Sequence, residues 1–325
     1  MKTKIVYVVT SDEDDYYLEQ ALVSVYSVRL YNPNSQILLL IDSETNATIV
    51  GKRETILQYV SQKIVIDVPK QYSKMQKSRF LKTTLRQYIE GDFLFIDSDT
   101  IITGDLSEID NIPFDIAAVP DQHVVIRYNW LRGSIKKWAM LLDWKFSEDA
   151  LYFNSGVFYV KDRPITLDFY KNCFTIWNKS SSKGLHIDQP SLAKTDELHN
   201  HIIGELDGIW NCQVNENGLP YLMDAKIIHY FASGRKGKRN NPYSFYNSTI
   251  YEKIKEEGKV GIELHNKILK AKSAFDSPCV IIGNTDIPFF FSDTHQIYLK
   301  AKYFFVLIEF VSSILMSIGR LIKRL

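Results

Sequence analysis

Short apolar runs recur along the first hundred residues, and polar residues follow each of them. None of these runs has helical spacing, and they lie at 5–9, 36–42, 63–68 and 93–96. The stretches between them have apolar residues near helical spacing, at 16–31, 47–59 and 77–88. Buried parallel strands form continuous apolar runs, and helices connect them. This order predicts an α/β fold with a mostly parallel, Rossmann-like sheet, right-handed crossovers and flanking helices.

After residue 100 the pattern continues with less regularity. Three further strand-like runs lie at 115–120, 151–160 and 226–231, and a helical pattern covers 165–179. Asn154-Ser155-Gly156 interrupts the second of these runs. A core strand gains nothing from such residues, so we expect either a bulge or a close approach of the backbone to a ligand. The mixed, tryptophan-containing segment 121–149 fits a loop and helix lying over the site.

Two carboxylates end the apolar run at 93–96. Asp97 and Asp99 are separated by one residue, so in extended backbone they point the same way. In an open α/β sheet, ligands bind outside the carboxyl ends of the strands, and oxygen ligands suit Mg²⁺ or Mn²⁺. The alternative is a turn in which both side chains cap backbone N–H groups. The local sequence leaves both interpretations open.

Three more groups of polar residues stand where chain segments begin or end. His229 is near the end of the last strand-like run, and a structural histidine is the alternative to a metal ligand. Asp188-Gln189 precedes a helix that Pro190 opens, where Asp188 could simply interact with the helix dipole. The basic, glycine-containing segment 233–239 suits a phosphate-bearing ligand, although a solvated loop would have the same composition.

Composition narrows the class of protein. The 325 residues carry a formal net charge of +1, which argues against a nucleic-acid-binding protein that depends on a positive field. The three cysteines form no CxxC pair, so we expect neither a disulfide framework nor a zinc site. This favours a reducing compartment. The N-terminus reaches an acidic cluster too early for a signal peptide and is interpreted as a first strand.

The most hydrophobic segment is the C-terminal tail. On a helix over 303–322, the residues at 309, 312, 313, 317, 320 and 324 form a narrow polar stripe beside a wide apolar face. Lysine and arginine residues cluster at the end of this segment. The pattern favours a helix that lies in the plane of an anionic membrane surface. A spanning helix and a helix packed on the core are the alternatives.

Together these features resemble the retaining glycosyltransferases of family 8, which have the GT-A nucleotide-diphospho-sugar transferase fold. The resemblance covers roughly the first 240 residues and depends on several motifs occurring in order. The motifs are the strand at 5–9 with Thr10-Ser11-Asp12, Arg79 in Ser-Arg-Phe-Leu, Asp97-Ser98-Asp99, Phe153-Asn154-Ser155-Gly156-Val157, Asp188-Gln189 and His229-Tyr230-Phe231. One departure follows the histidine, where the family usually has Gly-Pro-x-Lys-Pro-Trp and this chain has Ala232-Ser233-Gly234-Arg235-Lys236-Gly237-Lys238.

The resemblance implies a role for each matching residue. Asp97, Asp99 and His229 would hold Mn²⁺ or Mg²⁺. The nucleotide sugar would be bound by Thr10, Asp12, Tyr17 (or the neighbouring Tyr16), Arg79, Asp97 and Ser98, with Gly234 and either Arg235 or Lys236 at the diphosphate. The catalytic group would consist of Gln189, Asp188 and Asn154. An amide such as Gln189 is a poor nucleophile, so we expect the acceptor to attack from the leaving-group face, which retains the anomeric configuration.

The function that the resemblance implies is that of a hexosyltransferase (EC 2.4.1.-). It would move galactose or glucose from UDP-galactose or UDP-glucose to a saccharide or lipid-linked glycan acceptor, in the synthesis of bacterial lipopolysaccharide or another surface glycan. We expect a GT-A catalytic domain at 1–265, a mixed extension at 266–302 and an amphipathic helical tail at 303–325. That tail would attach a cytoplasmic enzyme to the inner face of the plasma membrane.

Two other functions have a similar pattern. A sugar-nucleotide nucleotidyltransferase would share the sheet and the paired acids. It would require a basic, glycine-rich loop after the first strand, and this chain has an acidic segment at 12–15 there. A catalytically inactive relative that binds glycans or membranes would share the fold. The intact acids at 97, 99 and 188, with Gln189 and His229, argue against that function.

Overall fold

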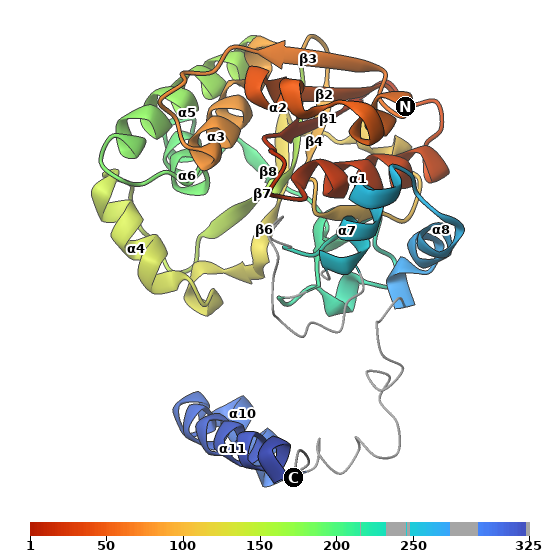
Figure 1. Cartoon of the computed structure of the whole chain (residues 1–325). Coiled ribbons are helices and arrows are strands. Elements are labelled where there is room, and N and C mark those ends of the chain that lie inside the picture. Colours follow the sequence, from red (N-terminus) through yellow and green to blue (C-terminus); the bar gives the residue numbers. More distant parts are fainter. Residues whose placement is uncertain (215, 232–244, 246–247, 274–291, 323–325) are drawn as a thin grey trace. The chain divides into compact units, whose positions relative to one another are not determined.

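The computed structural model describes residues 1–214, 216–231, 245, 248–273 and 292–322 (Figure 1). The chain divides into two compact units, Met1–Ala274 and Phe275–Leu325. The first unit contains every strand found among the described residues, and the second contains two helices.

A seven-stranded sheet forms the centre of the first unit, in the order β3-β2-β1-β4-β7-β6-β8. The pairs β3–β2, β2–β1, β1–β4 and β6–β8 are parallel, and β7 runs antiparallel to both its neighbours. The strands are β1 Lys4–Val9, β2 Ile37–Asp42, β3 Gln62–Ile66, β4 Phe93–Ile96, β6 Ile116–Val125, β7 Leu151–Val160 and β8 Ile203–Glu205. The mostly parallel sheet and its first four strands are confirmed.

A second, three-stranded sheet consists of β5 Thr100–Ile102, β10 Ile227–His229 and β9 Cys212–Gln213. β5 begins one residue after Asp99, and β10 pairs with it antiparallel, so that His229 lies opposite Thr100. The backbone N–H of Tyr230 donates to the carbonyl of Asp99 at 3.0 Å. This pairing brings the end of a late strand to the end of β4, more than a hundred residues away in sequence.

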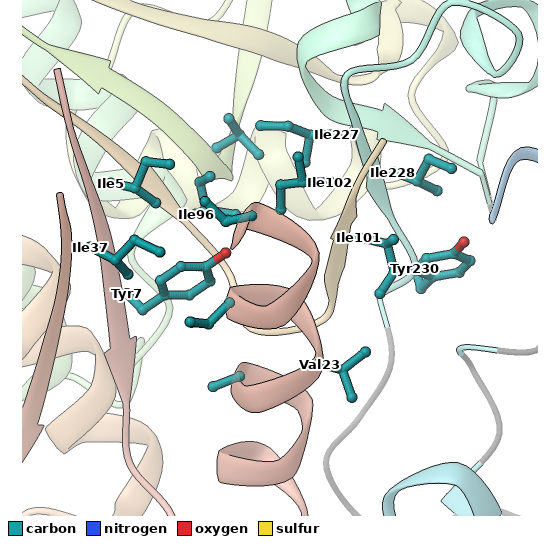
Figure 2. Close-up of a cluster of buried hydrophobic side chains, with 14 of the residues drawn as sticks. Ile5, Tyr7, Val23, Ile37, Ile96, Ile101, Ile102, Ile227, Ile228 and Tyr230 are labelled. Carbon is teal, nitrogen blue, oxygen red and sulfur yellow. The ribbon is translucent and has the colours of Figure 1, made fainter. Parts of the chain in front are cut away.

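Helices cover both faces of the main sheet. One face packs against α1 Tyr17–Tyr31, and the other packs against α3 Lys74–Thr84, α5 Pro164–Ser181 and α6 Gln189–Leu198. The alternate side chains of β1 divide between the two faces, as the period of a strand requires. Figure 2 shows the first of these cores, in which isoleucines of β1, β2, β4, β5 and β10 surround α1. The remaining described helices of this unit are α2 Ser43–Thr48, α4 Arg132–Leu141, α7 Ser248–Glu257 and α8 Ile262–Leu269.

Two helix predictions need correction. The single helix expected near 47–59 is instead α2 followed by a 3₁₀-helix, Gly51–Gln58, because Asp42 caps an earlier start and Gly51 has a left-handed φ of +58°. α3 begins at Lys74 rather than Lys77, because Ser73 and Gln76 form a capping box. Further 3₁₀ turns are Leu85–Gln87, Ser107–Asn111, Ile126–Tyr128, Gly208–Asn211, Leu219–Tyr221 and Ala271–Ser273.

The second unit has the helices α10 Asp293–Lys300 and α11 Lys302–Ile322. α11 confirms the helix expected at 303–322. Its window Lys302–Gly319 is long and apolar enough to cross a membrane by length and composition, with a mean hydropathy of 1.6. None of this window is buried within the protein. The expected domain boundaries at 265 and 302 stay predictions.

Candidate functional site

A cavity of the first unit opens where β1 and β4 end. β2 and β3 lie on one side of β1, and β4 lies on the other, so the order of the strands reverses here. Ligands of open α/β sheets bind at such a reversal, outside the carboxyl ends of the strands. The cavity has a volume of about 210 Å³ and is lined by Val8, Val9, Thr10, Tyr17, Lys74, Met75, Ser78, Arg79, Lys82, Asp97, Ser98 and Asp99.

Asp97, Asp99 and His229 converge at one end of this cavity. One potential ligand atom from each lies within 4.8 Å of the other two. The closest measured pair joins His229 Nε2 and Asp99 Oδ1 at 3.2 Å. An octahedral ion with ligands at roughly 2.1 Å would hold neighbouring ligand atoms roughly 3 Å apart. Two carboxylates and one imidazole therefore fit a divalent cation such as Mn²⁺ or Mg²⁺ in both chemistry and spacing.

The orientation of His229 is fixed from behind. Its Nδ1 lies 3.0 Å from Oδ1 of Asn211, which can only accept, so we assign the proton to Nδ1. With Nδ1 committed to Asn211, Nε2 faces Oδ1 of Asp99 and can donate a proton to it, and a bound cation would take the place of that proton at Nε2. Histidine ligands of metals are commonly oriented by such a partner on the other ring nitrogen. The donor set and the support of its histidine therefore suit a divalent cation.

The interruption in β7 makes room for this cluster. β6 pairs Ala118 with Phe158 and Pro120 with Phe153, so β7 carries three extra residues between those pairs. A Cβ at Gly156 would lie 2.3 Å from Cε1 of His229 and 3.0 Å from Oδ2 of Asp97. The bulge and the close approach, expected as alternatives, occur at the same place. What the backbone approaches is a side-chain cluster of the protein itself.

The two acids of the cluster differ in their electrostatics. Burial raises the pKa of Asp97 above its ordinary value; Lys82 opposes this, and repulsion from Asp99 adds to it. Burial would also raise the pKa of Asp99, but the attraction of His229, its hydrogen bond and Lys82 together lower it. Nζ of Lys82 lies 2.5 Å from Oδ1 of Asp97. Asp97 thus pairs with Lys82, whereas Asp99 pairs with His229.

Arg79 and Asp188 form an ion pair beside the cluster. Nε of Arg79 lies 3.1 Å from Oδ1 of Asp188, which is the residue preceding α6. Burial opposes the charged form of Asp188, but Arg79, Lys82 and a hydrogen bond with Ser155 hold its pKa below the ordinary value. Asp188 is therefore a buried, charged carboxylate whose position depends on α3 and on the bulge of β7.

A hydrogen-bonded network connects His229 to Gln189. Asn211 donates to Oδ1 of Asn154 at 3.0 Å, and Asn154 donates to Oδ1 of Asp121 at 2.9 Å. Nε2 of Gln189 donates to the same oxygen of Asp121 at 3.3 Å and to the carbonyl of Phe153 at 3.1 Å. The network joins β6, β7 and the first residue of α6, and Asp121 is its centre.

The opposite side of the cavity contains the residues that follow β1. Thr10 and Tyr17 line it directly. Asp12 reaches it through an ion pair with Lys74, whose Nζ also lies 2.6 Å from Oδ2 of Asp15. The acidic segment after β1 is therefore partly neutralised by a lysine of α3.

Residues 8–236 match the sequence model of glycosyl transferase family 8, which covers more than half of the chain. The chain belongs to glycosyltransferase family 8. A search of curated protein sequences finds no match.

Glycosyltransferases also occur among similar solved structures. An active-site mutant of LgtC has a TM-score of 0.54 at 16% identity, over 82% of this chain and 100% of that chain. A complex of the galactosyltransferase LgtC with donor and acceptor sugar analogues has a TM-score of 0.51 at 12% identity, over the same shares of both chains. GlyE of Streptococcus pneumoniae TIGR4 has a TM-score of 0.50 at 16% identity, over 85% of this chain and 66% of that chain. At these identities the structures establish the GT-A fold.

The structure brings most of the predicted site residues of this glycosyltransferase together. Thr10, Tyr17, Arg79, Asp97, Ser98 and Asp99 line or border one cavity. Asp188, Gln189, Asn154 and His229 join it through ion pairs and hydrogen bonds. Gly234, Arg235 and Lys236 lie outside the described residues. The roles of all these residues stay predictions.

Sequence reasoning missed three residues of this family 8 site. Asp121 is the centre of the hydrogen-bonded network, and Asn211 connects that network to His229. Lys82 forms an ion pair with Asp97. Asp121 follows the strand at 115–120, so its place at the end of a strand was an available signal. Asn211 had no such signal, because it lies in a 3₁₀ turn that only the pairing of β9 with β10 brings near His229.

Proposed function

We propose that this enzyme transfers a hexose, galactose or glucose, from a UDP-sugar to a saccharide acceptor in bacterial surface-glycan synthesis, and that it requires Mn²⁺ or Mg²⁺. The observation that carries the proposal is the Asp97–Asp99–His229 cluster at the base of the cavity between β1 and β4. The similarity to a galactosyltransferase crystallised with donor and acceptor sugar analogues supports a nucleotide-sugar donor and a saccharide acceptor. A divalent ion held by these three residues would stabilise negative charge on the departing diphosphate.

Other side chains of the site would bind the separate parts of the donor. Thr10 and Tyr17 would contact the nucleoside at the far side of the cavity, and Arg79 would contact the diphosphate or the sugar. Asp188 is charged and buried next to Arg79, which suits it to accept hydrogen bonds from the hydroxyl groups of the donor sugar. Each group is held by the fold before the substrate arrives, so little reorganisation is needed during the reaction.

The network supports attack from the leaving-group face. Asp121 is a candidate nucleophile beside Gln189, but both of its oxygens already accept hydrogen bonds, from Asn129, Asn154 and Gln189. Those bonds reduce the nucleophilicity of the carboxylate, and the amide of Gln189 is itself a poor nucleophile. In the proposed step the acceptor oxygen bonds to the anomeric carbon as the bond to the diphosphate oxygen breaks. The acceptor proton passes to the leaving phosphate.

The acceptor side of the network has an exposed aromatic residue. Asn129 reaches inward to Asp121, and the next residue, Trp130, is 67% exposed. The indole N–H of Trp130 donates to Oε2 of Glu216 at 3.0 Å, which holds the ring in one orientation. Aromatic rings combine an apolar face with a polar handle, as binding of a sugar ring requires. We therefore place the acceptor against Trp130.

The C-terminal tail is the basis for the proposed location of the enzyme in the cell. We propose a catalytic domain at 1–265, a mixed C-terminal extension at 266–302, and an amphipathic helix at 303–325 that attaches the cytoplasmic enzyme to the inner face of the plasma membrane. The support is the apolar surface of α11, whose exposed residues are Tyr303, Phe304, Val306, Leu307, Phe310, Val311, Ile314, Leu315, Met316 and Ile318. Apolar area and nearby cations both strengthen binding to anionic lipid surfaces. This location suits a lipid-linked acceptor.

Incubation of the purified protein with Mn²⁺ and a panel of nucleotide sugars tests the proposed activity. The measured quantity is the release of nucleoside diphosphate, with and without added saccharides. We expect UDP release from UDP-galactose or UDP-glucose that is stimulated by an acceptor. Release of pyrophosphate from a nucleoside triphosphate and a sugar phosphate would instead indicate a nucleotidyltransferase.

A further inference from the structure

Lys82 is a buried cation that already contacts a residue of the metal cluster. It lies on α3, its side chain is 8% exposed, and its ammonium group is 4.9 Å above the ring of Phe95. Nζ lies 2.5 Å from Oδ1 of Asp97. Among the described residues, Asp97 is the carboxylate with which Lys82 forms an ion pair. A lysine loses much side-chain freedom and hydration when it is buried, so this position requires a compensating role.

The two oxygens of Asp97 face different partners. Oδ1 is the atom that contacts Lys82, whereas Oδ2 is the one that lies 3.0 Å from the Cβ position of Gly156, on the side of His229. Asp97 can therefore offer Oδ2 to a cation while Oδ1 remains paired with Lys82. Lys82 does not need to leave when the ion enters, and its positive charge would stay beside that of the ion.

The charge balance of the site then depends on Lys82. The acidic groups at this end of the cavity are Asp97, Asp99 and Asp188, and the basic groups are Lys82 and Arg79, which gives a net charge of −1 with His229 neutral. A divalent ion would change this charge to +1, and a diphosphate would compensate the excess. Without Lys82 the net charge would be −2, which the ion alone would neutralise.

We propose that Lys82 couples metal binding to the donor: it weakens binding of the divalent ion to the empty site and strengthens it when a nucleoside diphosphate is present. This inference rests on the proposed function, because it uses the same metal site and the same nucleotide. Lys82 lines the cavity with Arg79, Asp97 and Asp99, so its charge is available to the diphosphate as well as to the carboxylate. Coupling of this kind is reciprocal, so the ion would strengthen nucleotide binding by the same factor.

Direct measurement of Mn²⁺ affinity tests the coupling. Free Mn²⁺ is followed by electron paramagnetic resonance with the full-length protein, with and without saturating UDP. In the wild type we expect UDP to tighten Mn²⁺ binding by roughly tenfold or more, within the usual range of coupling. Lys82→Met, which keeps the length and loses the charge, is expected to bind Mn²⁺ roughly tenfold more tightly without UDP and to gain little from UDP. Lys82→Arg keeps the charge and is expected to retain the wild-type coupling.

Lys77→Met provides the matched control. Lys77 is a buried lysine of the same helix, but it pairs with Asp42 and Glu44 rather than with the cluster. Its substitution is expected to leave both Mn²⁺ affinities at wild-type values, and thermal unfolding verifies that each variant is folded. A folded Lys82→Met protein whose Mn²⁺ affinity and UDP coupling equal those of the wild type would overturn the inference alone. A wild type that binds no Mn²⁺ with or without UDP would overturn the proposed metal site as well.

Discussion

The imidazole of His229 occupies the space that a side chain at position 156 would need. A Cβ at Gly156 would lie 2.3 Å from Cε1 of His229, well inside van der Waals contact, and the backbone N–H of Asp97 donates to the carbonyl of Gly156 at 2.7 Å. The bulge of β7 therefore positions two of the three cluster residues. The φ angle of Gly156 is not in the left-handed region, so backbone conformation does not require a glycine here. The close contact with His229 is what requires it.

Gly156→Ala is expected to displace His229 or Asp97 and to lower kcat/KM for UDP-sugar turnover by roughly 100-fold. Overpacking should also lower the free energy of unfolding by about 1–3 kcal/mol, measured by urea denaturation. Gly133→Ala is the control, because Gly133 lies in α4 with nothing within 4 Å of its Cβ position. That variant should be fully active. Equal activity of the two variants would contradict the close approach.

Trp130→Ala is expected to raise the KM for the saccharide acceptor by roughly tenfold, the equivalent of about 1.4 kcal/mol. Hydrolysis of the UDP-sugar in the absence of acceptor should be unchanged, because the donor cavity does not include Trp130. Met140→Ala removes a similarly exposed apolar side chain from α4 and should change neither quantity. An acceptor KM that is unaffected by Trp130→Ala would place the acceptor elsewhere.

His123 should make the stability of the fold depend on pH. Burial lowers its pKa to about 4, from an unfolded value near 6.5, and its Nε2 accepts a hydrogen bond from the backbone of Gln213. The unfolded chain therefore takes up a proton before the folded protein does, so stability should be full above pH 6.5 and should fall as the pH decreases toward 4.

Thermal unfolding of the wild type and of His123→Gln, between pH 7 and pH 4.5, measures this contribution. The wild type should lose several degrees more in Tm than the variant over this range. Tyr221 stacks on the ring of His123, so the variant will be less stable at pH 7 for a different reason. Parallel pH curves of the two proteins would exclude His123 as a source of the pH dependence.

The helix α11 should determine membrane attachment. Deletion of residues 303–325 is expected to move the protein from the membrane fraction to the soluble fraction. Val311→Glu with Ile318→Glu places charges on the apolar face and should have the same effect, because both side chains would lose their burial in lipid. Ser313→Glu with Ser317→Glu adds the same charge to the polar stripe, and it should retain most of the attachment. Unchanged partitioning of the first double variant would reject the in-plane helix.

The sequence predicted the elements of this site better than their contacts. Apolar runs and the residues that end them located β1, β4 and β10, together with Asp97, Asp99 and His229. Contacts between side chains that are far apart in the chain could not be predicted from the sequence. Lys82 was recognised as a helical residue, but its contact with Asp97 depends on how α3 packs on the sheet. Asp121 was treated as the start of a loop, although it is the centre of a buried network.

The metal requirement of the proposed transfer is tested most directly by Asp99→Asn. Asp99 is one of the three proposed ligands, and the variant keeps the size of the side chain while losing its charge. UDP release from UDP-galactose and UDP-glucose is measured for the wild type and the variant, with Mn²⁺ and with an excess of chelator. We predict that the wild type loses its activity in chelator and recovers it with Mn²⁺, and that Asp99→Asn is inactive in both conditions. Transfer that is insensitive to chelator, and equal in the two proteins, would contradict a metal-dependent glycosyltransferase at this site.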